Sequence, residues 1–168
     1  MARIRRILVP TDLSAAARAA YPVAVEQARR GPSEVVLLHV MEWYPYVTLE
    51  GGIIPLQPPE YEADIRERVR SEAARLKGVR VRTEIRSGPA ADGILREAKR
   101  GKADLIVMST HGRRGFARWM LGSVAERVVR GATCPVLTVK PSAAAAKTPD
   151  RTGRRTMTPI GKTVVVSV

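Results

Sequence analysis

The chain has 168 residues, of which 45% are hydrophobic and 27% charged, with one cysteine and a formal net charge of +13. This length suits one domain with its own core and leaves room for a tail. A single cysteine excludes an internal disulfide framework or a cysteine-rich metal site and fits a reducing cytoplasm. The apolar run at residues 7–9 is too short for a secretory signal, and no run approaches the roughly 18 apolar residues of a membrane span. We therefore expect a cytoplasmic protein with no membrane partner.

The net charge of +13 raises the question of a nucleic-acid partner. Arginines alternate with acidic residues, as in residues 60–69, and this spacing puts opposite charges on one solvated helix face. One Phe and two Trp offer few rings to stack on bases. We interpret most of the charge as solvated surface. A nucleic-acid partner is therefore less favoured than a solvated basic surface, although the charge does not exclude it.

Five apolar runs predict β-strands, at residues 4–10, 34–40, 79–85, 103–109 and 135–139. Continuous apolar stretches within them are typical of strands covered on both faces. Between the strands, apolar residues recur with helical spacing, as at Tyr21, Ala24, Val25 and Ala28. This alternation predicts an α/β fold: a single doubly wound, five-stranded parallel sheet with helices on both faces, Rossmann-like. A strand order of 3-2-1-4-5 would make the carboxyl ends of the first and fourth strands neighbours, where such sheets bind ligands.

Two segments fall outside this pattern. Residues 43–58 contain prolines and aromatic residues and predict a long irregular loop, which is either a lid over the site or a packing flap. From Pro141 onward the composition shifts to Ala, Lys, Thr, Pro and Arg, which predicts a flexible basic tail. We therefore expect one domain at residues 1–140 and a tail at 141–168. Residues 163–168 would form a strand if an edge were available to pair with.

A candidate site follows the fourth predicted strand. The apolar run from Leu105 ends in a loop that holds Gly112, and Gly122 and Ser123 then open a helical pattern. A helix N-terminus presents unpaired N–H groups and the positive end of the helix dipole, which together favour an anion. Glycine lets the backbone approach a ligand closely. The stretch therefore predicts a nucleotide-binding module.

Five segments, in this order and spacing, resemble the universal stress protein family over residues 1 to about 140: they lie at 7–12, 37–40, 107–112, 121–126 and 134–137. Nucleotide-binding members carry Gly, two residues, Gly, nine residues, then Gly followed by Ser or Thr. Gly112 and Gly122 match the second and third glycines, with nine residues between them, and Ser123 follows. Ser109 replaces the first glycine. It is small, and its hydroxyl could itself meet a phosphate.

The resemblance implies an adenine nucleotide such as ATP, with Mg²⁺ or Mn²⁺ on its phosphates. Backbone groups of Val40 would meet the adenine edge, with Pro10 and Thr11 flanking it. Asp12 would lie near the ribose or a phosphate-bound metal ion. The floor and the phosphate-binding residues would be Met108, Ser109, Gly112, Arg113, Gly122, Ser123 and Val124.

Some of these residues also have plainer interpretations. Asp12 could cap the first helix, with Ser14 as its competitor. Ser123 and Glu126 form a Ser-x-x-Glu capping box, which needs no ligand. Arg113 could neutralise a phosphate or could simply be solvated. These alternatives stay open at the level of sequence.

The pattern favours binding over turnover. Phosphoryl transfer needs a base that positions the nucleophile and dedicated metal carboxylates, and Asp12 is the single acidic residue around this site. We therefore expect no catalytic residues and at most a weak ATPase activity. The leading hypothesis is a stress-response regulatory module that works with an unidentified protein partner, as a homodimer paired through the edge strand at 135–139. The alternatives are a slow ATP-hydrolysing or nucleotidyl-transfer enzyme and a basic nucleic-acid-binding stress protein.

Overall fold

The computed structural model describes residues 3–42, 59–110 and 121–141, together with the backbone of three short strands at 46–47, 53–54 and 163–166.

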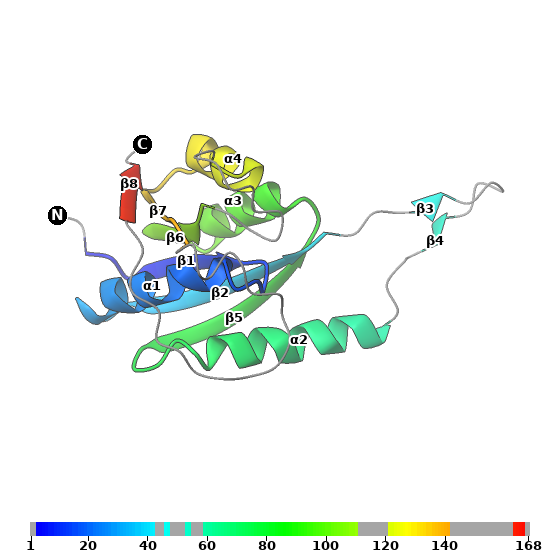
Figure 1. Cartoon of the computed structure of the whole chain (residues 1–168), viewed down its shortest axis with the longest axis horizontal. Helices are drawn as coiled ribbons and strands as arrows, with labels where there is room; N and C mark the ends of the chain where they lie inside the picture. The colour runs from blue at the N-terminus through cyan, green and yellow to red at the C-terminus, as the bar shows by residue number, and fades with distance from the viewer. Residues whose placement is uncertain are drawn as a thin grey trace.

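A six-stranded sheet with the order β5-β2-β1-β6-β7-β8 forms the centre of the molecule (Figure 1). Its parallel strands are β1 (Arg6–Thr11), β2 (Glu34–Met41), β5 (Arg80–Ser87), β6 (Leu105–Ser109) and β7 (Val136–Val139). Numbered along the chain, these five strands have the order 3-2-1-4-5, which confirms the predicted topology. The sixth strand, β8 (Thr163–Val166), is antiparallel to β7.

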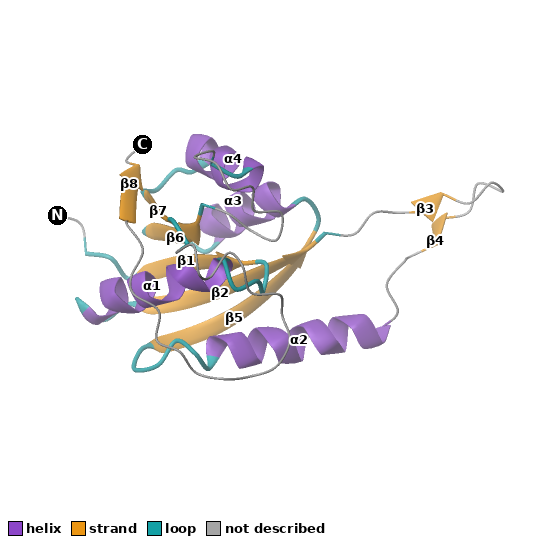
Figure 2. Cartoon of the chain, viewed as in Figure 1, coloured by secondary structure: helices purple, strands orange, loops and turns teal. Residues whose placement is uncertain are grey.

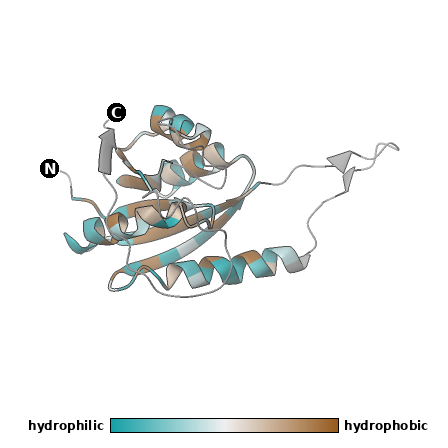
Figure 3. Ribbon diagram, in the orientation of Figure 1, coloured by the Kyte–Doolittle hydropathy of each residue, from teal (hydrophilic) through white to brown (hydrophobic). Residues whose placement is uncertain are grey.

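Helices cover both faces of the sheet (Figure 2). One layer holds the short 3₁₀ helix η1 (Ala17–Ala19), α1 (Ala20–Arg29) and α2 (Pro59–Ala73), and the other holds α3 (Ala90–Arg100) and α4 (Ser123–Gly131). Successive strand residues point to opposite faces, so β1 supplies Ile7 and Val9 to the first layer and Leu8 to the second. Figure 3 shows the consequence: the inner strands are hydrophobic, whereas the described part of α2 is mainly hydrophilic.

The segment at 43–58 departs from the predicted irregular loop. Its short strands β3 (Tyr46–Val47) and β4 (Ile53–Ile54) pair antiparallel, and this hairpin lies apart from the main sheet (Figure 1). Pairing between two such short segments is a local feature, and the prolines on either side argued against it in the sequence. The lid and packing-flap interpretations concern side chains outside the described residues.

Helix α3 approaches β2 most closely at Gly93. A Cβ at this position would lie 2.9 Å from both Cγ atoms of Val40, closer than ordinary van der Waals contact. The β-branched Val40 side chain has little freedom to move away. Gly93 therefore sets the distance between α3 and the carboxyl end of β2.

We predict that Gly93→Ala lowers the free energy of unfolding by about 1–2 kcal/mol, because overpacking outweighs the gain in helix propensity. Gly31→Ala is the matched control, since a Cβ there meets nothing within 4 Å. Urea denaturation of both variants measures the difference. A Gly93→Ala protein as stable as the control would contradict this packing argument.

Candidate functional site

The carboxyl ends of three parallel strands meet at one edge of the sheet. Thr11 at the end of β1 pairs with His39 of β2, and β1 also pairs with β6 through Leu8 and Ile106. This arrangement brings most of the predicted nucleotide contacts to the same edge: Pro10, Thr11, Asp12, Val40, Met108 and Ser109. Gly112 and Arg113 lie outside the described residues, so their assignment stays a prediction.

The turn after β1 is held in a strained conformation. Leu13 has a φ of +65°, a left-handed value that is uncommon for a residue other than glycine. Two features hold it there: its side chain is 5% exposed in the core, and its N–H donates to the Thr11 Oγ1 at 3.0 Å. The Thr11 Oγ1 in turn lies 2.9 Å from the Tyr21 hydroxyl of α1. Tyr21 thus braces the loop that carries Asp12.

Asp12 and Ser14 divide the local hydrogen bonds between them. One oxygen of Asp12 accepts the Ser14 N–H at 3.0 Å, and the Ser14 hydroxyl accepts the N–H of Ala17, the first residue of η1, at 3.2 Å. The N-cap of η1 is Ala16, so neither Asp12 nor Ser14 is the cap residue, and the cap interpretation of Asp12 is wrong; of the two, Ser14 is the one whose side chain bonds the first residue of η1. The Asp12 side chain instead closes a turn with the backbone two residues on, at Ser14, and Asp12 is half-buried at the edge of the site.

The start of α4 is bonded directly to the end of β6. The Gly122 N–H donates to the carbonyl of Thr110 at 2.9 Å, and the Thr110 N–H donates to Val139 of β7 at 2.9 Å. Because Gly122 is the N-cap, the first intrahelical bond runs from the Glu126 N–H to the Gly122 carbonyl at 2.9 Å. The amides of Ser123, Val124 and Ala125 therefore have no acceptor within the helix. They lie on the first turn of α4, where the helix dipole favours an anion.

This geometry revises two expectations for α4. Ser123 is the first helical residue rather than the cap, so the predicted capping box with Glu126 is wrong; Glu126 pairs with Arg130 at 3.0 Å. The N–H of Gly122 is engaged by Thr110, so Gly122 acts as the cap rather than as a phosphate donor. The adjacent glycine, not the serine, adopts the extended conformation that a cap requires, and the sequence alone did not distinguish them.

His39 is a satisfied core residue. It is 6% exposed, and its Nδ1 lies 2.8 Å from the Thr11 carbonyl oxygen. A carbonyl oxygen only accepts, so Nδ1 carries the proton. This bond ties the end of β2 to the end of β1, directly beside Val40. Within the described ranges no group of three His, Cys, Asp or Glu side chains could hold a metal ion.

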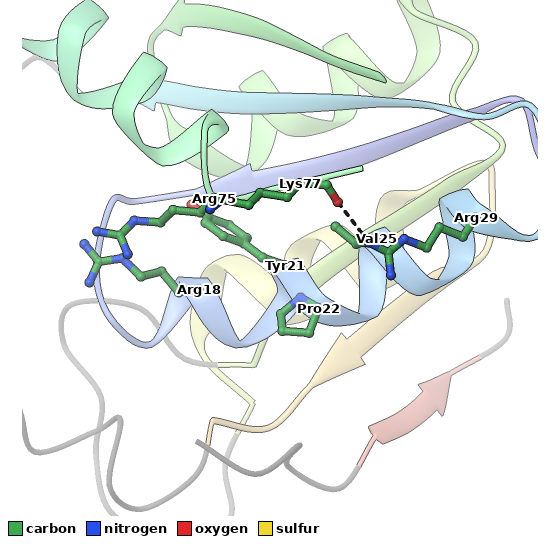
Figure 4. Close-up of a pocket in the computed structure, with 7 residues that line it drawn as sticks. All are labelled: Arg18, Tyr21, Pro22, Val25, Arg29, Arg75 and Lys77. Carbon is green, nitrogen blue, oxygen red and sulfur yellow. Dashed lines mark hydrogen bonds between the residues drawn. The ribbon is translucent and has the colours of Figure 1, made fainter. Parts of the chain in front are cut away.

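A cavity of about 400 Å³ lies between α1 and the segment that joins α2 to β5, and its lining includes none of the predicted nucleotide contacts (Figure 4). Its lining is basic with an apolar floor: Arg18, Tyr21, Pro22, Val25, Arg29, Arg75 and Lys77. Glu72, 5% exposed, pairs with Arg18 at 2.9 Å and with Arg75 at 3.2 Å. Burial is the main cause that raises the pKa of Tyr21 well above its ordinary value. Sequence reasoning assigned Tyr21 to the core stripe of α1, and no pattern signalled its hydrogen bond to Thr11.

Residues 3–140 match the Universal stress protein family. The chain belongs to this family. Universal stress protein MJ0531 of Methanocaldococcus jannaschii is 39% identical over 140 residues, which is 81% of this chain and 82% of that protein. Within the described part of the chain, none of the helices has the length and apolar character needed to span a bilayer.

Solved structures of the family share the fold. The structure of the M. jannaschii protein MJ0577 has a TM-score of 0.66 and 26% identity, and the match covers 84% of this chain and 99% of that one. A universal stress protein in complex with cAMP has a TM-score of 0.61 and 24% identity, over 84% of this chain and 100% of that one.

We predict that Tyr21→Phe lowers the free energy of unfolding by about 1 kcal/mol, because it removes one buried hydrogen-bond partner of Thr11. Tyr61→Phe is the matched control, since Tyr61 is 39% exposed on α2. Chemical denaturation measures both. Equal stability losses in the two variants would show that the Tyr21 hydroxyl does not brace the turn.

Proposed function

We propose that this chain binds ATP or a related adenine nucleotide at the carboxyl ends of β1, β2 and β6 and acts as a regulatory module in the stress response. The observation that carries the proposal is the start of α4. Its first-turn amides, at Ser123 and Val124, lack intrahelical acceptors, and main-chain bonds through Thr110 hold them at the end of β6. Rossmann-like sheets bind ligands at this edge.

The adenine end of the proposed ligand lies at β2. The last residue of β1, Thr11, pairs opposite His39, so Val40 lies one residue beyond it at the mouth of the site. Gly93 allows α3 to approach Val40 closely and fixes this strand end. Main-chain groups of Val40 would then read the edge of the base, with Pro10 and Thr11 beside it.

The cAMP complex of another universal stress protein supports the choice of an adenine nucleotide. Its likeness to this chain shows a shared fold, and that fold accommodates an adenine ring and a phosphate in the other protein. Ser109 is small and 8% exposed. It occupies the position of the first glycine of the motif, which is expected to lie near the phosphates.

A divalent ion would enter with the nucleotide. Asp12 is the single carboxylate predicted for this site, and one of its oxygens already accepts the Ser14 N–H. Such a donor set fits Mg²⁺ or Mn²⁺ carried mainly by phosphate oxygens, with Asp12 as an added ligand or a contact through water. It does not fit a metal ion held by the protein alone.

The proposed output is a change in how the protein associates. In this proposal the chain works in the cytoplasm as a homodimer formed through β7, with a protein partner whose affinity depends on the bound nucleotide. A nucleotide bound at the start of α4 lies next to Thr110, whose main chain bonds both Gly122 and Val139 of β7. Through these two bonds the proposed phosphate site is connected to β7.

We predict that ATP raises the melting temperature of the protein by mass action, by the equivalent of about 2.7 kcal/mol at a hundredfold excess over Kd. Tripolyphosphate controls for the charge of a basic protein, and adenosine controls for the base alone. Neither should match ATP. No shift with ATP, or an equal shift with tripolyphosphate, would contradict adenine-nucleotide binding.

A proline substitution can test the contribution of the Ser123 N–H to binding without disturbing the helix. Ser123→Pro removes the first amide of α4, yet proline is favoured at the first helical position, and Gly122 (φ −62°, ψ 148°) already has the conformation required before proline. We predict an unchanged melting temperature without ligand and roughly tenfold weaker ATP binding, the loss of one charge-assisted hydrogen bond. Ser123→Ala, which keeps the amide, is the matched control. Full ATP affinity in Ser123→Pro would show that this amide does not contact phosphate.

A further inference from the structure

The outer edge of β7 is occupied by the chain itself. A strand within a sheet has two hydrogen-bonding edges. One edge of β7 pairs with β6, from Val136 opposite Ile106 to Val139 opposite Ser109. The other edge pairs with β8, from Val136 opposite Val166 to Val139 opposite Thr163. Every residue of β7 is therefore paired on both sides. The edge that the proposed dimer needs is the one β8 holds.

β8 has the direction that a second copy's strand would have. Two identical strands that pair across a two-fold axis perpendicular to their sheet must run antiparallel. β8 also runs antiparallel to β7, and it covers all four residues of that strand. Its sequence, Thr-Val-Val-Val, is β-branched throughout, and β7 reads Val-Leu-Thr-Val. In direction, length and composition, β8 resembles the β7 of a partner molecule.

We propose that β8 is an internal substitute for the partner strand: it covers the β7 edge within one chain and must leave before a second copy can pair there. The proposal rests on the dimer assigned to β7 under the proposed function, and it adds the control of that interface. Since one edge accepts one strand, the closed form with β8 and the two-fold β7 pairing exclude each other.

The tether gives β8 an advantage over a free copy. Residues 140–162 join the two strands, so β8 meets its edge within one molecule, at an effective concentration on the order of 1 mM. The competing β7 of a second copy offers a ladder of similar length at a far lower concentration. Both copies must open before they pair. If β8 is closed in about nine chains of ten, the dimer dissociation constant rises about a hundredfold.

Sedimentation equilibrium over a concentration series tests the proposal with three proteins besides the full chain. One ends at Pro141 and lacks β8. The second, Val164→Pro/Val165→Pro, retains the full length but cannot form the ladder, because successive N–H groups point to opposite edges and one of the two must face β7. The third, Val164→Thr/Val165→Thr, is the matched control that keeps β-branching and both N–H groups.

We expect the shortened and proline proteins to dimerise with a dissociation constant at least about tenfold lower than that of the full chain and of the threonine control. If the full chain dimerises as tightly as the shortened protein, the dimer stands and the substitute-strand proposal is overturned. If none of the four dimerises, pairing through β7 itself fails, and this proposal fails with it. The ATP-dependent melting shift, measured on the same samples, reports nucleotide binding independently of either outcome.

Discussion

Two main-chain hydrogen bonds at Thr110 fix the geometry on which the site depends. Its carbonyl accepts the Gly122 N–H and its own N–H donates to Val139, each at 2.9 Å. β6 and β7 are buried parallel strands and move little, so the first turn of α4 is held in register with their carboxyl ends. Preorganised amides bind an anion without the cost of ordering them first. The same two bonds connect the proposed phosphate site with the strand proposed to mediate association.

In the part of the chain that the structure describes, most arginines pair with acidic residues. Along α2, Arg66 pairs with Glu62 and Arg68 with Asp64, as the alternating sequence predicted. Glu97, at 4% exposure, bonds Arg86 and Arg100. Such pairs on the surface contribute little stability, whereas a buried carboxylate that lost its arginines would be costly. For the described residues, the pairing agrees with a solvated surface rather than a nucleic-acid footprint.

The sequence predicted the parallel core because strands buried on both faces appear as continuous apolar runs. Runs such as Val35, Val36, Leu37 and Leu38 are apolar on both faces, and the structure buries all four between helix layers. The order of the strands followed from general rules of crossover connections and from the family resemblance. β8 was foreseen only on condition that an edge were available, because strand propensity does not state which edge a tail will meet.

The sequence predicted which strand ends carry the candidate site's residues, but not how those residues are held. Six of its residues follow from strand ends, since the carboxyl ends of neighbouring parallel strands must coincide. The left-handed Leu13 and the brace from Tyr21 depend on contacts between the turn and α1, which no local pattern reveals. The choice between Gly122 and Ser123 as the cap depends on the bond to Thr110, a residue outside the helix. Tertiary contacts decide such features.

We propose that first-turn amides of α4 hold the phosphate of an adenine nucleotide whose base lies at Val40. Backbone ¹H–¹⁵N NMR spectra recorded during titration with AMP and with adenosine test it most directly. We expect AMP to shift the amide resonances of Ser123 and Val124 together with that of Val40, and adenosine to shift Val40 but leave the α4 amides nearly unchanged. Binding of AMP that leaves the Ser123 and Val124 resonances unmoved would contradict it.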